Sequence, residues 1–205
     1  MKKIFLLSAF ALTIFGANAQ FTFGVKGGLN LANTAVSPTD GVTYKSIAAI
    51  QLGVTAEYAI NNNIGVESGL LYSGKGAKGE VSILGESFSV TGTANYLEIP
   101  VNAVYKINAG NSKVLLNAGP YFAFALGGKL KPSVGDSRSI KIGSSEDSDI
   151  KGTDVGLNIG AGLLLKEKIT VGLQYGLGLA NISPRSGETI NNRVFSLTVG
   201  YKFVK

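Results

Sequence analysis

The chain has 205 residues, of which 45% are hydrophobic, and a formal net charge of +6, but it contains no cysteine and no histidine. These absences exclude disulfides and thiolate metal sites, and they remove the commonest general base and metal ligand. The positive charge is spread without a long basic run, which argues against nucleic-acid binding. Beyond the N-terminal segment, no apolar run reaches the roughly 18 residues that a transmembrane helix needs.

The N-terminus has the three parts of a secretory signal peptide. Lys2 and Lys3 precede an apolar run over residues 4–15, and an A-N-A motif ends at Ala19. This pattern predicts cleavage between Ala19 and Gln20. Residues 1–19 are therefore left out of the fold prediction, and residues 20–205 are treated as one domain.

Eight segments of the remaining chain alternate apolar with small or polar residues. They cover residues 21–31, 48–60, 64–73, 96–107, 113–126, 153–165, 169–179 and 193–203. The segment 169–179 is the clearest, whereas 113–126 carries apolar residues at both parities. A period of two places alternate side chains on opposite faces of a strand, and about 9 to 11 residues suffice to cross a bilayer.

The connections between these segments alternate in length. The long ones cover residues 32–47, 74–95, 127–152 and 182–192, and the others are short turns. Within 74–95, two strand-like runs flank Gly85 and Glu86 and predict that the hairpin continues beyond the membrane. An even strand number with all long loops at one end predicts an all-β fold, an eight-stranded antiparallel up-and-down transmembrane β-barrel.

Apart from Tyr175 in mid-strand, the aromatic residues on the apolar faces fall near the two ends of the predicted strands. At the short-turn end they are Phe21, Phe23, Tyr58, Tyr105, Tyr201 and Phe203, and at the long-loop end they are Tyr72, Phe122, Phe124 and Phe195. Two belts of aromatic rings are typical of a barrel anchored at both membrane interfaces.

The charged residues within the strands share the parity of the polar face, which predicts that they point into the lumen. They are Lys26, Glu57, Glu67, Glu98, Lys106, Asp154 and Lys202. Because buried charges need partners, we expect the three glutamates to meet Lys26, Lys106 or Lys202. Paired carboxylates could form an acid–base site, but a structural ionic plug is favoured, because side chains just fill a barrel of eight strands. No open pore, metal or cofactor is expected.

Two local features depart from the repeating strand pattern. Residues 74–79 match G-x-G-x-x-G, but no helix follows, so we interpret them as a solvated basic loop and not as a dinucleotide site. Pro100 and Pro120 fall inside predicted strands, where each should mark a bulge or a lost ladder hydrogen bond. Glycines on the polar face are expected to leave room for long charged side chains.

Several segments resemble the PorT-like family of outer-membrane β-barrel proteins. The most specific are NYLEIPVNAVYK at 95–106 and NRVFSLTVGYKF at 192–203, and others lie at 24–33, 67–78, 117–124 and 175–183. The resemblance implies an eight-stranded barrel in the outer membrane of a Gram-negative cell with a periplasmic N-terminus. It also implies a link of one branch to protein secretion, and it carries over no catalytic residue. Val204 and Lys205 depart from the pattern by following the final aromatic residue.

The function predicted first is a non-enzymatic, monomeric outer-membrane barrel that contacts membrane lipid and has a structural role or binds a protein partner or ligand through its long loops. A second hypothesis is an accessory barrel of a secretion or assembly complex. A third is a barrel enzyme acting on lipid or peptide, which lacks the usual histidine or cysteine. A fourth is a soluble barrel with an apolar lumen, which the parity of the charged residues contradicts.

Overall fold

The computed structural model describes residues 20–39, 41–83 and 86–203, so the predicted signal segment 1–19 lies outside the described residues. No helix within this part of the chain is long and apolar enough to span a membrane. The strands are β1 (Phe21–Ser37), β2 (Thr43–Lys45), β3 (Ile47–Ala59), β4 (Ile64–Ile83), β5 (Glu86–Ala109), β6 (Ser112–Pro132), β7 (Arg138–Ser139), β8 (Thr153–Leu165), β9 (Ile169–Gly178) and β10 (Thr189–Phe203).

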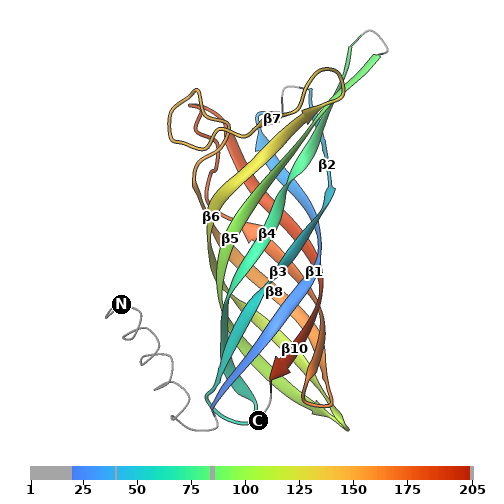
Figure 1. Ribbon diagram of the computed structural model, residues 1–205, viewed down its shortest axis with the longest axis vertical. Helices are drawn as coiled ribbons and strands as arrows, with labels where there is room; N and C mark the ends of the chain where they lie inside the picture. Colours follow the sequence, from blue (N-terminus) through green and yellow to red (C-terminus); the bar gives the residue numbers. More distant parts are fainter. Residues whose placement is uncertain (1–19, 40, 84–85, 204–205) are drawn as a thin grey trace, which may run out of the picture.

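Eight long strands close into a tall barrel (Figure 1). Strand β1 pairs with both β3 and β10, and β4 pairs with both β3 and β5, so the ring has no free edge. Every pairing between these strands is antiparallel. The short strands β2 and β7 add to β4 and β6 above the ring. The structure therefore confirms the eight-stranded antiparallel barrel.

Short turns gather at one end of the barrel, and the long connections gather at the other. In the first turn, the Asn61 side chain accepts hydrogen bonds from the backbone amides of Asn63 and Ile64, at 2.9 and 2.8 Å. The side-chain acceptor, and not left-handed backbone, makes this turn. In the turn before β9, Lys166 and Glu167 adopt positive φ angles of 50° and 59°.

The long connections contain more strand than the sequence predicted. Residues 74–95 are paired without a register shift from Gly74–Asn95 to Ile83–Glu86, so the β4–β5 hairpin projects beyond the rest of the barrel (Figure 1). This confirms the continued hairpin, but it corrects the interpretation of residues 74–79 as a solvated loop. Strand β6 likewise extends to Pro132, inside the predicted loop 127–152.

The apolar faces of the strands form the outer wall. Leu173 and Leu197 are 48% and 49% exposed, whereas Glu57 and Glu98 are 3% and 4% exposed in the lumen. The ten aromatic residues of the two predicted belts also lie on the exterior. At the short-turn end the Phe21 ring packs 5.0 Å from the Tyr58 ring. In this part of the barrel, apolar residues lie outside and charged residues lie inside, which contradicts a soluble barrel with an apolar lumen.

Glycine allows close approach between strands at two inward positions. A Cβ atom added at Gly53 would lie 2.0 Å from the Leu70 carbonyl oxygen, and one at Gly119 would lie 2.0 Å from that of Val101. At these two positions the neighbouring backbone occupies the space. Gly53 and Gly119 therefore permit the close strand contacts of a narrow barrel. At Gly65, in contrast, an added Cβ atom would lie 3.0 Å from Oε1 of Glu57, so this glycine leaves room for a charged side chain, as predicted.

Both prolines lie at interruptions of the ladder. Along β4 and β5 the pairs Ser68–Val101 and Leu71–Glu98 share one register on either side of Pro100. Along β5 and β6 the register is likewise unchanged between Pro100–Tyr121 and Ala103–Ala118. The prolines thus mark lost pairing and not a bulge.

Candidate functional site

Ion pairs fill the lumen near the short-turn end. The carboxylate of Glu57 on β3 contacts Lys106 on β5 and Lys202 on β10. Next to it, the Lys26 ammonium lies 3.0 Å from a carboxylate oxygen of Glu67. These five residues join five strands, so the arrangement ties together distant parts of the ring.

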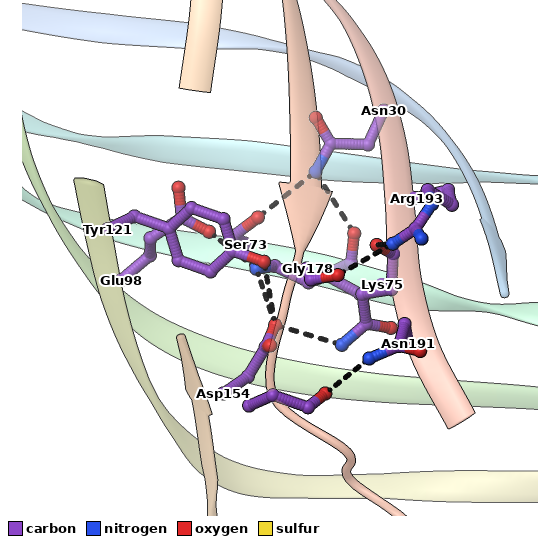
Figure 2. Close-up of polar contacts among 12 residues, drawn as sticks. Asn30, Ser73, Lys75, Glu98, Tyr121, Asp154, Gly178, Asn191 and Arg193 are labelled. Atoms are coloured by element: carbon purple, nitrogen blue, oxygen red, sulfur yellow. Dashed lines mark hydrogen bonds and ion pairs between the residues drawn. The ribbon is translucent and has the colours of Figure 1, made fainter. Parts of the chain in front are cut away.

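A second, more completely buried cluster surrounds Lys75 on β4 (Figure 2). Its Nζ atom lies 2.7 Å from Oε2 of Glu98 and 3.1 Å from Oδ2 of Asp154. The Tyr121 hydroxyl and the Asn192 side-chain amide donate to the same Asp154 oxygen, at 3.0 and 2.9 Å. One cation thus faces two buried carboxylates. The Tyr121 hydroxyl and the Asn192 amide stabilise the remaining negative charge, and an aromatic ring face stabilises the ammonium group.

Tyr96 and Tyr121 complete this cluster. The Lys75 ammonium lies 4.0 Å from the centre of the Tyr121 ring and 5.3 Å from that of Tyr96. Both tyrosine side chains are fully buried and point into the lumen. A cavity beside Lys75 and Tyr121 measures only about 10 Å³, which is the size of a single water at most. The cluster therefore closes the barrel.

The structure corrects one pairing and adds residues that the sequence analysis missed. Glu98 pairs with Lys75, and not with Lys26, Lys106 or Lys202. Lys75 has the same parity as Glu67 along β4, and this parity was the available signal. It was missed because the apolar alternation ends at Ser73, where the strand was predicted to stop.

Hydrogen bonds between neutral groups also cross the lumen. The Asn30 side-chain amide donates to Ser73 Oγ at 3.1 Å and to the Gly74 carbonyl at 3.0 Å (Figure 2). Ser196 Oγ donates to Asn30 Oδ1 at 2.8 Å. Within the described residues, no group of three acidic, histidine or cysteine side chains is placed to hold a metal ion.

Above the Lys75 cluster, the long-loop end encloses a cavity of about 700 Å³. Tyr96 and Asn192 line it on the side of the Lys75 cluster. Its walls are mainly apolar and include Val36, Val42, Val81, Phe88, Val90, Leu130, Ile140, Ile150, Ile182 and Ile190. Phe88 and Val90 keep 43% and 45% of their surface exposed, so the cavity is accessible from outside. Small-molecule sites typically measure roughly 300 to 1,000 Å³ and have apolar walls.

A β-bulge creates the apolar wall on β6. Asn95 pairs with Gly127 but Tyr96 pairs with Ala125, which leaves Leu126 as an extra residue. Below the bulge, the even-numbered residues of β6 face outward, whereas above it Leu130 lines the cavity. The interior is therefore mainly polar below the bulge, apart from a small apolar cluster of Val104, Leu115 and Leu164, and it is apolar at the mouth.

Charged residues at the rim of the cavity are paired with each other. The Arg138 guanidinium donates two hydrogen bonds of 2.7 Å to the two carboxylate oxygens of Asp149. This contact lowers the pKa of the Asp149 carboxyl and raises that of Arg138, while burial of the carboxyl opposes its shift. A looser pair joins Arg185 to Glu188 at 3.8 Å. The rim thus presents no net charge from these four residues.

The solved structures that are similar to this chain include the following three. The attachment invasion locus protein Ail of Yersinia pestis is 16% identical, with a TM-score of 0.46, and the match covers 90% of this chain and 99% of Ail. Neisserial surface protein A is 15% identical, with a TM-score of 0.47 and coverages of 89% and 97%. OprG of Pseudomonas aeruginosa is 14% identical, with a TM-score of 0.49 and coverages of 91% and 97%. No curated protein sequence matches the chain.

The family model described as the outer membrane protein beta-barrel domain matches residues 17–183. This match covers most of the chain, including seven of the eight strands of the ring. The protein is located in the outer membrane, and the chain belongs to the outer membrane protein beta-barrel domain family.

Proposed function

We propose that the protein is a non-enzymatic, monomeric outer-membrane barrel that binds an uncharged apolar small molecule at its outer mouth. The observation that carries this proposal is the apolar cavity of about 700 Å³ above a lumen closed by Lys75, Glu98 and Asp154. A ligand that enters from the long-loop end meets this plug and cannot continue through the barrel. Rigid strands hold the cavity, and the long connections supply its rim.

The charge of the rim favours an uncharged ligand. Arg138 is held by both oxygens of Asp149, so binding an anion there would require this pair to break. The walls supply apolar side chains, and Asn192 supplies a polar group close to the plug. An apolar molecule with a hydroxyl group matches this distribution.

A single fluorescent label at the rim tests the proposal. Because the chain has no cysteine, Val134→Cys gives one attachment site, on a lining residue that is already 75% exposed. We expect saturable spectral shifts with octan-1-ol and a much weaker response to octanoate. Val90→Asp should weaken octan-1-ol binding by about tenfold, since it places a charge in the apolar wall.

The matched control is Thr91→Asp, one residue along β5, where the side chain points to the other face. It should leave octan-1-ol binding unchanged. Equal responses to octan-1-ol and octanoate, or equal effects of the two aspartates, would contradict a cavity selective for uncharged ligands.

The alternative is an accessory barrel of a secretion complex, as the PorT-like resemblance implies. The β4–β5 hairpin favours this alternative, because it projects beyond the barrel and offers a surface to a partner (Figure 1). Shortening the hairpin by removal of residues 80–89 should then abolish co-purification of a specific partner in mild detergent, while heat-modifiable gel mobility is kept. A complex that survives this deletion would contradict a role of the hairpin.

A further inference from the structure

Four lysines lie close together on the outer wall above the aromatic residues of the long-loop end. Lys45 on β2 pairs with Lys78 on β4, Lys78 pairs with Thr91 on β5, and Thr91 pairs with Lys131 on β6. Lys129 lies two residues before Lys131. We call Lys45, Lys78, Lys129 and Lys131 the lysine band.

The lysine band faces away from the mouth cavity. On β6 the intervening Leu130 lines the cavity, so Lys129 and Lys131 lie on the opposite face, and both are exposed. Tyr44 likewise lines the cavity next to Lys45. The β6 bulge is responsible for this placement, because without it the two β6 lysines would point inward.

The lysine band lies above the upper aromatic belt, higher than a headgroup layer of roughly 5 to 7 Å. Tyr72, Leu97 and Phe124 form one row across β4, β5 and β6, and this row includes two residues of the upper aromatic belt. Along the strands, Lys129 and Lys78 lie four and six residues above this row. At about 3.3 Å per residue and a tilt of about 40°, these offsets are roughly 10 and 15 Å along the membrane normal. From such positions the lysine side chains reach the headgroup phosphates by bending toward the membrane.

The charge of the lysine band is only partly compensated. Glu80 contacts both Lys45 and Lys78. Across the described ranges of the chain, no ion pair joins Lys129 or Lys131 to a carboxylate. Like charges on neighbouring strands are unfavourable unless an anion neutralises them. An anion supplied from outside the protein would stabilise this surface.

We propose that the lysine band binds the phosphate-bearing headgroups of lipids in the outer leaflet. The apolar wall directly below accepts the acyl chains, so a lipid can contact Leu97 and Phe124 with its chains while its phosphate meets the lysines. A phosphate free in water lacks the acyl-chain contact. This proposal is independent of ligand binding in the mouth cavity, because it uses the opposite face of the same strands.

The test measures which lipid gathers beside the lysine band. Thr93→Cys places a single fluorophore between Gly76 and Lys129, and Asn62→Cys places one at the short turns for comparison. The protein is reconstituted in phosphatidylcholine nanodiscs that contain a small fraction of nitroxide-labelled phosphatidic acid or nitroxide-labelled phosphatidylcholine. At Thr93→Cys we expect stronger quenching by labelled phosphatidic acid than by labelled phosphatidylcholine. This excess quenching should fall by up to about fivefold for each lysine removed.

The variant K129Q/K131Q should remove most of this excess at Thr93→Cys and leave quenching at Asn62→Cys unchanged. K129R/K131R keeps the charges and should retain the excess. Equal quenching by the two lipids in the unmodified lysine band would overturn the proposal. Retention of the full excess in K129Q/K131Q would also overturn the proposal. So would complete removal of the excess quenching in the unmodified lysine band by inorganic phosphate at matched ionic strength.

Discussion

The Nζ atom of Lys75 lies 3.1 Å from Oδ2 of Asp154, although 79 residues separate them in the sequence. Lys75 is 2% exposed and Asp154 is fully buried. Glu98 contacts the same ammonium group, so the three residues join β4, β5 and β8 across the lumen. This cluster closes the barrel below the mouth cavity and separates a polar interior from an apolar one.

Substitution of Lys75 by methionine should destabilise the barrel strongly. It keeps an apolar chain of similar length but leaves Glu98 and Asp154 buried without their cation, and such a loss costs about 3 to 5 kcal/mol. The free energy of unfolding in lipid vesicles, measured by urea titration, gives the effect. Lys78→Met, three residues along the same strand but on the surface, should change it by less than about 1 kcal/mol. Comparable losses in the two variants would contradict a buried plug.

Glu57 and Glu67 should differ in their contribution to stability. Glu57→Gln leaves two lysines, Lys106 and Lys202, without their shared carboxylate in a buried place. Glu67→Gln affects only Lys26, and both members of that pair are 14% exposed. We expect a loss of about 3 to 5 kcal/mol for Glu57→Gln and a clearly smaller one for Glu67→Gln. A larger loss for Glu67→Gln would argue against the shared role of Glu57.

The rim loop should loosen at acidic pH. Because Arg138 lowers the pKa of Asp149 in the folded protein, the contact stabilises the loop at and above the ordinary pKa of aspartate, near 3.9. This stabilisation is lost as the pH falls through the lowered folded pKa. The Lys141 amide, which donates to Asp149 Oδ2 at 2.8 Å, provides the readout by hydrogen exchange.

Asp149→Asn should increase hydrogen exchange at the Lys141 amide severalfold already at neutral pH. The protection of this amide, relative to its intrinsic exchange rate, should then no longer depend on acid. The control Asp147→Asn changes an exposed residue two positions away and should leave exchange unchanged. Loss of protection at neutral pH in both variants would show that the Arg138 contact does not hold this loop.

The alternation of apolar residues predicted the barrel, because the outer wall must match a membrane at every second residue. It failed to predict how far the strands continue. Beyond Ser73 the outer face of β4 carries Lys78 and no longer an apolar residue, yet the backbone pairing continues to Ile83. Apolar alternation reports contact with hydrocarbon, whereas a strand ends only where its hydrogen bonds end.

The lumen charges show a similar division. Parity predicts which face a charge occupies, and Glu57 and Glu98 lie in the interior. Partners across the lumen depend on the stagger of all eight strands, which no local pattern reports. The β6 bulge is also hidden in the sequence, and it decides that Leu130 faces the mouth cavity while Lys129 faces outward.

The most direct test of the account compares the cost of one arginine at two heights on the outer wall. Leu173 lies between the two aromatic belts, whereas Thr91 lies above them in the row of the lysine band. In phosphatidylcholine vesicles, Leu173→Arg should lower the free energy of unfolding by about 2 to 4 kcal/mol and Thr91→Arg by about 0 to 1 kcal/mol. Equal costs at the two positions would contradict the claim that hydrocarbon covers the wall around Leu173.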